Sequence, residues 1–327
     1  MTPNRREGGR AQRHPEAGFS LIEVMAALVI LSIAMTAVFA TFTAQQQSFT
    51  VQSRVAEMQQ NLRQAVEYMS RDIRMAGYGI PDNVVIPPGI IAAGVNSIRL
   101  LYAKDNTTGP DQIYVLYRFD MDDNQKPNST NGGVPSNAST VTLDNSVDYS
   151  HFLPTGGELV LVTNTTTADL YETSAAAGTT LTFGGGYAYN AGHTRSYPVG
   201  PPAVTVAKAR FVRYYIDSAT DPAHPMLMVD RMGGAAPQPL ADDIEDMQLA
   251  YGLDTNADGI VDSWTASPTT PSQIRQVRLQ FIARTRLPEA GWVETRPALG
   301  NRAAGTTPDG YRRRTYDIVI DVRNSGV

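Results

Sequence analysis

"GFSLIEVMAALVILSIAMTAVFA", residues Gly18 to Ala40, is a long apolar run with one acidic residue, Glu23, just inside its start. No charged residue occurs from Val24 to Ala44, which matches the roughly 20 residues that a helix needs to cross a bilayer core. The stretch therefore predicts a transmembrane helix over about residues 21–44. Because a carboxylate is costly to place in a bilayer, we expect Glu23 to have a function and a charged partner.

Four arginines precede the apolar run: Arg5, Arg6, Arg10 and Arg13. Positive residues that flank a transmembrane helix stay in the cytoplasm. We therefore expect a cytoplasmic N-terminus, with everything after Ala44 on the other side of the membrane. A secretory signal peptide is the alternative, but it would have a shorter apolar core and a small-residue cleavage site at its far end.

A helical pattern continues beyond the apolar run. Apolar residues recur at steps of three and four, which mark one stripe of an amphipathic helix; they are Val51, Val55, Met58, Leu62, Ala65, Met69, Ile73 and Ala76. Gly77, Gly79 and Pro81 then end the pattern. The sequence predicts one helix from Leu21 to Ala76, which is apolar all round in its first half and one-sided in its second half.

The rest of the chain has the pattern of a β-rich domain. Short alternating or β-branched runs, separated by turn-rich segments, predict strands within Ser97–Ala103, Gln112–Phe119, Glu158–Thr163, Ala203–Ile216, Pro225–Val229, Gln273–Ala283 and Arg314–Val322. The segment Asn124–Ser150 is rich in Asn, Ser, Thr, Gly and Pro, and is expected to be an exposed loop. The fold class is therefore α+β, with a long N-terminal helix packed on a β-rich head.

Composition excludes several classes of site. The chain has no cysteine, which rules out disulfides, zinc-thiolate sites and a cysteine nucleophile. Its formal net charge is −5, and an acidic balance disfavours a nucleic-acid groove, which needs a basic surface. The four histidines are scattered and no H-E-x-x-H or G-x-S-x-G motif occurs, so we expect no enzymatic activity.

A basic leader that ends in Gly18, followed by Phe19 and a helix that carries Glu23, resembles the processing site of type IV pilins and type II secretion pseudopilins. The resemblance implies a leader (residues 1–18), a pilin helix (19–78) and a globular head (79–327). It implies that a prepilin peptidase cleaves after Gly18 and methylates Phe19. It also implies that Glu23 neutralises the amino group of Phe19 on a neighbouring subunit when the chain leaves the inner membrane for the pilus.

Further segments resemble the PilW-type minor pilins; they are "RQAVEYMSRDIRMAGYG" (63–79), "RYYID" (213–217), "DDIEDMQLAYGLD" (242–254) and "RRRTYDIVIDV" (312–322). This resemblance implies a low-copy subunit of a type IV pilus, in a tip or priming complex, with the major pilin and other minor pilins as partners. The capping pseudopilin of a type II secretion system shares the leader and the helix, so it remains an alternative. A tip adhesin is a third possibility, which the loop Asn124–Ser150 would suit.

"DTNADGIVD", Asp254 to Asp262, matches the first half of an EF-hand calcium loop. The ligands would be side chains and one backbone carbonyl, from Asp254, Asn256, Asp258, Ile260 (carbonyl) and Asp262. The twelfth position is Thr265 in place of a bidentate Glu, so a complete EF-hand is excluded. The motif predicts a Ca²⁺ site completed by ligands from elsewhere in the head, and a metal-free polar turn is the alternative.

Overall fold

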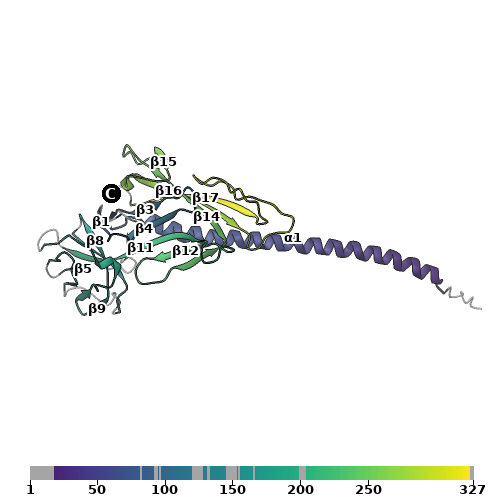
Figure 1. Ribbon diagram of the computed structural model, residues 1–327, viewed down its shortest axis with the longest axis horizontal. Helices are drawn as coiled ribbons and strands as arrows, with labels where there is room; N and C mark the ends of the chain where they lie inside the picture. Colours follow the sequence, from purple (N-terminus) through teal and green to yellow (C-terminus); the bar gives the residue numbers. More distant parts are fainter. Residues whose placement is uncertain are drawn as a thin grey trace, which may run out of the picture. The chain divides into compact units, whose positions relative to one another are not determined.

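The computed structural model describes residues 18–81, 83–91, 95, 97–119, 128–130, 133–144, 153, 155–164, 166–198 and 204–324. The chain divides into two compact units, residues 1–53 and 54–327. Its elements are shown in Figure 1 and are α1 (Leu21–Met75), β1 (Val84–Val85), β2 (Ser97–Ile98), β3 (Leu101–Lys104), β4 (Gln112–Arg118), β5 (Asn128–Ser129), β6 (Thr140–Thr142), β7 (Leu159–Thr163), β8 (Ala168–Glu172), β9 (Ala175–Ala177), β10 (Thr180–Thr182), η1 (Ala188–Asn190), β11 (Thr205–Asp217), β12 (Met226–Arg231), β13 (Gln238–Asp242), β14 (Ile244–Leu253), β15 (Ser263–Thr265), η2 (Pro271–Gln273), β16 (Ile274–Arg284) and β17 (Arg313–Asp321).

The predicted fold class is confirmed, because one long helix precedes a strand-rich head. The helix predicted from Leu21 to Ala76 runs from Leu21 to Met75. It ends where glycine permits a backbone that other residues avoid, since Gly77 and Gly79 have φ angles of 77° and 64°. A side chain at Gly77 would also collide with Leu100, because its Cβ would lie 2.9 Å from the Leu100 Cβ.

Within the second unit, the amphipathic part of α1 supplies one wall of the main core. Its buried apolar residues are Met58, Leu62, Ala65, Val66, Met69 and Ile73, and Ala76, directly after the helix, is buried with them. All of these except Val66 lie at the predicted steps of three and four. They pack with side chains from strands β4, β11, β12, β14, β16 and β17. The head therefore includes the helix from about Arg54, and a fragment that begins at Gly79 would lack part of its own core.

The strands in the described part of this unit form three sheets. The largest has ten strands with the central order β13-β12-β11-β7-β8-β1-β2, a second has the order β6-β10-β9, and the third has the order β15-β14-β16-β17. Strand β11 organises the first sheet, since its residues 209–214 pair with β4, residues 205–208 pair with β7, and residues 212–217 pair with β12. One long strand thus joins two groups of shorter strands.

Asp111 connects two of these sheets. It precedes β4, its backbone N–H donates to the carbonyl of Met247 in β14 over 2.8 Å, and its carboxylate accepts the backbone N–H of Leu249 over 2.8 Å. Burial raises the pKa of Asp111 to about 7, so part of the population carries a neutral carboxyl at this junction near neutral pH.

Each predicted strand region contains a strand, but the prediction for Asn124–Ser150 is wrong in the part that the structure describes. Residues 140–142 form β6, and Val134, Val141 and Leu143 are buried in a second core with β7, β8 and β10. The segment is rich in turn-forming residues, and three isolated apolar residues do not make a strand pattern. They are buried because other strands cover them. Residues 124–127, 131–132 and 145–150 lie outside the described residues.

A buried carboxylate on α1 joins the helix to the largest sheet. The carboxylate of Asp72 accepts hydrogen bonds from the hydroxyls of Tyr117 in β4, at 2.8 Å, and Tyr214 in β11, at 2.5 Å. Asp72 is 5% exposed. Burial, and next the adjacent carboxylate, raise the pKa of both tyrosines, so both remain protonated donors. These bonds fix the rotation and the height of the helix on the sheet.

Replacing Asp72 with alanine is expected to lower the free energy of unfolding by about 2 kcal/mol or more, because two buried hydroxyls lose their acceptor. Denaturant unfolding of the detergent-solubilised chain, followed by the near-ultraviolet signal of the tyrosines, measures the change. Glu57→Ala, which removes an exposed acid from the same helix, is the control and should change stability little. Equal stability of the two variants would contradict this role of Asp72.

Candidate functional site

The start of α1 combines a helix cap with the predicted processing site. Gly18 and Phe19 precede the helix and are exposed, Phe19 by 82%. Ser20 caps the helix, since its carbonyl oxygen accepts the backbone N–H of Glu23 over 3.1 Å and its Oγ accepts the same N–H over 3.3 Å. Glu23 lies in the first turn, where the positive end of the helix dipole favours an acid. The local structure thus leaves the Gly18–Phe19 peptide accessible.

The first half of α1 exposes its apolar surface on all sides. None of the described residues from Gly18 to Ser53 is buried within its own unit. The helix is long and apolar enough to cross a membrane by length and composition. An apolar surface of this extent needs a cover of lipid or of other helices, because soluble proteins rarely expose apolar patches beyond a few hundred Å².

The loop Asp254–Asp262 brings the predicted calcium ligands close together, with backbone donors among them. The buried carboxylate of Asp254 accepts the N–H groups of Asp258 and Gly259, and Asp262 accepts the N–H and the hydroxyl of Thr255. Asn256 donates to Asp258 over 3.1 Å. The side chain of Ile260 is exposed. The loop therefore has the sharp turn that the motif predicts, with φ of 86° at Gly259.

A calcium ion fits this arrangement only in part. Arg275 lies 3.0 Å from Asp254 and neutralises the ligand expected at the first position of the loop. Burial opposes ionisation of Asp254, but the hydrogen bonds from Gly259 and Arg275 offset it and lower its pKa. The hydroxyl of Thr255 lowers the pKa of Asp262. Among the described residues no group of three or more His, Asp or Glu side chains is placed to hold a metal ion. Calcium binding thus stays a prediction that requires these side chains to turn inward.

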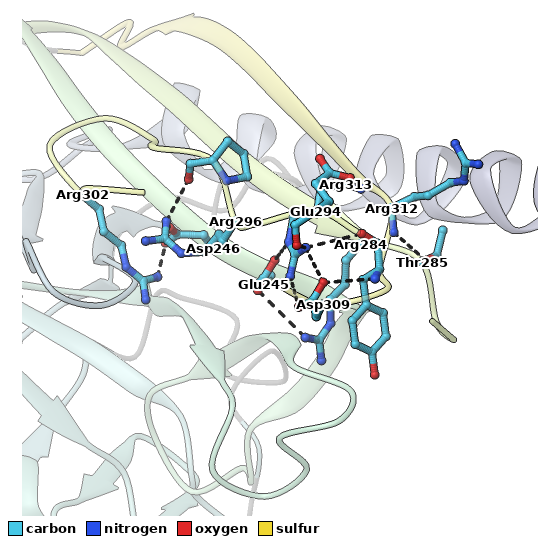
Figure 2. Close-up of polar contacts among 12 residues, drawn as sticks. Glu245, Asp246, Arg284, Thr285, Glu294, Arg296, Arg302, Asp309, Arg312 and Arg313 are labelled. Atoms are coloured by element: carbon cyan, nitrogen blue, oxygen red, sulfur yellow. Dashed lines mark hydrogen bonds and ion pairs between the residues drawn. The ribbon is translucent and has the colours of Figure 1, made fainter. Parts of the chain in front are cut away.

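A network of arginines and carboxylates, hereafter the arginine clasp, joins β14 to the connection between β16 and β17 (Figure 2). Arg313 is almost fully buried and bonds Glu245 through Nε at 2.6 Å and Asp309 through Nη2 at 2.5 Å. The hydrogen bonds from Arg313 lower the pKa of Asp309. A second part of the clasp is formed around the buried Asp246, which lies 3.0 Å from both Arg296 and Arg302.

The arginine clasp holds the connection Thr285–Arg312 in place. Arg312 lies over the ring of Trp292 at 3.8 Å and bonds Glu289. This connection presents exposed apolar side chains, with Val293 74% and Leu287 49% exposed. Because breaking a buried ion pair leaves an uncompensated charge, the clasp keeps a long connection in a single conformation.

Two described histidines pair with aspartates. His193 lies 3.8 Å from Asp169, and His224 lies 2.8 Å from Asp243. The His193 and Asp169 side chains are fully buried, so no substrate would reach them. His224 lies just before β12 and Asp243 lies between β13 and β14. Their contact joins these two turns of the head. His14 and His151 are outside the described residues.

Comparison with known proteins gives two family matches. Residues 213–324 match the family described as Type IV Pilus-assembly protein W, and residues 13–39 match the Prokaryotic N-terminal methylation motif. Both matches support the resemblance to the PilW-type minor pilins. A search of the curated proteins finds no match. A type IV-like pilin from Thermus thermophilus resembles the structure with a TM-score of 0.37 and 11% identity, over 82% of this chain and 98% of that chain.

The two matches cover different parts of the chain. Gly18, Phe19 and Glu23 fall within the methylation motif, and the 254–262 loop falls within the PilW match. The PilW match also includes the arginine clasp, which the sequence analysis missed. Its acids and arginines were visible in "DDIED" and "RRRTYD", but nothing local indicates that Glu245 meets Arg313 across 68 residues.

Millimolar CaCl₂ is expected to raise the melting temperature of the detergent-solubilised chain, by linkage to the native state. Affinity should be in the range of about 0.1–1 mM found for extracellular modules, because the twelfth-position Glu is missing. Asp258→Ala should abolish the increase. Asp217→Ala, which removes an exposed acid from another turn, should retain it. Calorimetry with the same melting temperature in calcium and in chelator would leave the loop as a metal-free turn.

Proposed function

We propose that this minor pilin is stored in the inner membrane through α1 and enters a type IV pilus after cleavage between Gly18 and Phe19. The observation that carries the proposal is the division of one helix into two kinds of surface. Its first half is apolar and exposed, and its second half is part of the core of the head. Such a helix suits transfer between two apolar environments, the bilayer and a bundle of pilin helices, without refolding of the head.

Glu23 supplies the assembly contact in this proposal. After cleavage, the new amino group of Phe19 and the Glu23 carboxylate lie within one turn of the same helix end. In the bilayer the carboxylate carries an insertion cost of about 2.5–3.5 kcal/mol, which a salt bridge to the amino group of a neighbouring subunit offsets. A prepilin peptidase, which also methylates Phe19, the major pilin and other minor pilins are the partners in this scheme.

The size of the head supports a position at or near the pilus tip. A compact unit as long as residues 54–327 has a radius of gyration of about 19 Å, whereas packed helices lie only about 8–10 Å apart. A filament built on closely packed helices has little lateral room for such a head at every subunit, and a tip has more. We therefore infer a low-copy subunit of a tip or priming complex that starts assembly.

Glu23→Ala should stay inserted and be cleaved at Phe19, yet be at least about tenfold depleted from sheared pili, because the charge-assisted contact is lost. Mass spectrometry of the pili and of the inner membrane measures both pools and the processed N-terminus. Glu57→Ala, in the same helix outside the apolar run, is the matched control and should be recovered like the wild type. Equal recovery of Glu23→Ala would show that Glu23 is not the assembly contact.

The tip position predicts a copy number far below that of the major pilin, with immunogold label concentrated at filament ends. Quantitative mass spectrometry of purified pili gives the ratio, and an antibody to the head gives the position. Even label along the shaft at a near-stoichiometric ratio would contradict the tip position. Recovery only from secretion pseudopili would instead assign the chain to the capping role in a type II secretion system.

A further inference from the structure

A groove of about 750 Å³ lies beside the second half of α1, within the unit of residues 54–327. Side chains from α1, β11 and β17 and from the end of β4 line it; these elements can be followed in Figure 1. Among the described residues that line it, six are arginines and only one, Glu67, is acidic. The arginines are Arg63, Arg71, Arg74, Arg118, Arg210 and Arg323. We call this feature the arginine groove.

The six arginines come from distant parts of the sequence. Three lie on α1 at steps of eight and three residues, which places them within about 80° of one another around the helix. Arg118 ends β4, Arg210 lies in β11 opposite Tyr117, and Arg323 follows β17. Arg63, Arg71, Arg74 and Arg323 are exposed and the other two are half-buried. The groove thus collects positive charge from one helix face and three strands.

The walls of the arginine groove are partly apolar. Val66, Phe119 and Ile318 contribute to them. The Arg210 guanidinium lies 3.6 Å from the centre of the Phe119 ring, and this stacking holds its planar face against the wall. Guanidinium groups bind carboxylates through paired N–H donors. A ligand that presents carboxylates next to an apolar side chain therefore complements both parts of the groove.

Charge is distributed unevenly between the arginine groove and the rest of the chain. The chain has 27 basic and 32 acidic residues. With the six groove arginines set aside, the remaining 21 basic and 32 acidic residues give a net charge of −11. A short acidic segment that ends within the groove is attracted by the arginines. It does not extend over the rest of the surface, whose net negative charge would repel it. A long polyanion would extend over that remainder and be repelled, because nucleic-acid binding depends on a continuous basic surface.

We propose that the arginine groove is a docking site for a short surface segment of another pilin subunit, one that carries Asp or Glu side chains beside an apolar residue. The volume lies within the range of about 300–1,000 Å³ typical of ligand sites. The identity of the partner as a pilin rests on the proposed function, whereas the carboxylate chemistry rests on the groove alone. The docking would place a neighbouring head against the second half of α1, near Arg63 and Arg74.

The test measures binding of a fluorescent acetylated peptide, Asp-Glu-Leu-Asp-Glu-Leu, to the detergent-solubilised full chain by anisotropy. Arg63→Gln with Arg74→Gln should weaken binding by about tenfold or more, because two charged hydrogen-bond donors are removed. Arg278→Gln with Arg286→Gln removes the same charge from exposed arginines outside the groove and should change binding less than twofold. Added salt should weaken wild-type binding, since the site is solvent-exposed.

Several results would overturn the docking site. One is equal binding by the groove variant and the wild type, when thermal unfolding shows that both are folded. Another is equal binding of the amide peptide Asn-Gln-Leu-Asn-Gln-Leu. A third is tighter, groove-dependent binding of a single-stranded oligonucleotide or of vesicles with anionic lipid, which would assign the groove to phosphate groups.

A cellular experiment separates the groove from the proposed function. The Arg63→Gln, Arg74→Gln variant should be inserted and cleaved normally, but less of it should be recovered in pili than of the Arg278→Gln, Arg286→Gln variant. If peptide binding is lost and recovery in pili is unchanged, the partner is not a pilin subunit and this part of the proposal is wrong. If the wild-type chain itself is absent from pili, the proposed function fails while the peptide assay still reports on the groove.

Discussion

The head depends on the apolar stripe of α1 between Met58 and Ala76. The surrounding strands bury their inner faces against it, so the helix is a component of the core rather than a tether. One helix therefore meets two requirements. The part before Arg54 is apolar on all sides and needs lipid or other helices around it, whereas the later part presents one apolar face to the core of the head. The change from an apolar to a one-sided pattern along α1 satisfies both requirements without a break in the helix.

Polar contacts with long sequence separation then set the geometry of the packed elements. Asp72 receives two tyrosine hydroxyls from strands β4 and β11, and Asp111 bonds the backbone of β14. The arginine clasp performs the same role for the connection after β16 (Figure 2). Apolar packing alone would tolerate sliding between layers, whereas buried hydrogen bonds lose free energy as soon as a donor and its acceptor separate.

The arginine groove illustrates how a net charge can mislead. An overall charge of −5 disfavours a nucleic-acid groove, but it does not exclude a small basic site. The fold brings six arginines to one groove, where Glu67 is the one acidic residue among the described lining side chains. Opposite charges that are mixed along the chain become separated in space because α1, β4, β11 and the end of β17 converge, and only local charge determines what binds there.

The sequence by itself determined the helix, its end near Gly77, the class of the head and the Gly18–Glu23 motif. Each of these depends on spacing over a few residues, which a helix or a turn converts directly into structure. Tertiary structure alone decided that Asp72 bonds Tyr214 across 142 residues. It also decided that Val141 and Leu143 are buried within a segment of loop-like composition. In the predicted calcium loop, it placed Arg275 in an ion pair with Asp254. These contacts depend on which distant strands become neighbours, and the spacing of residues within one segment does not predict that pairing.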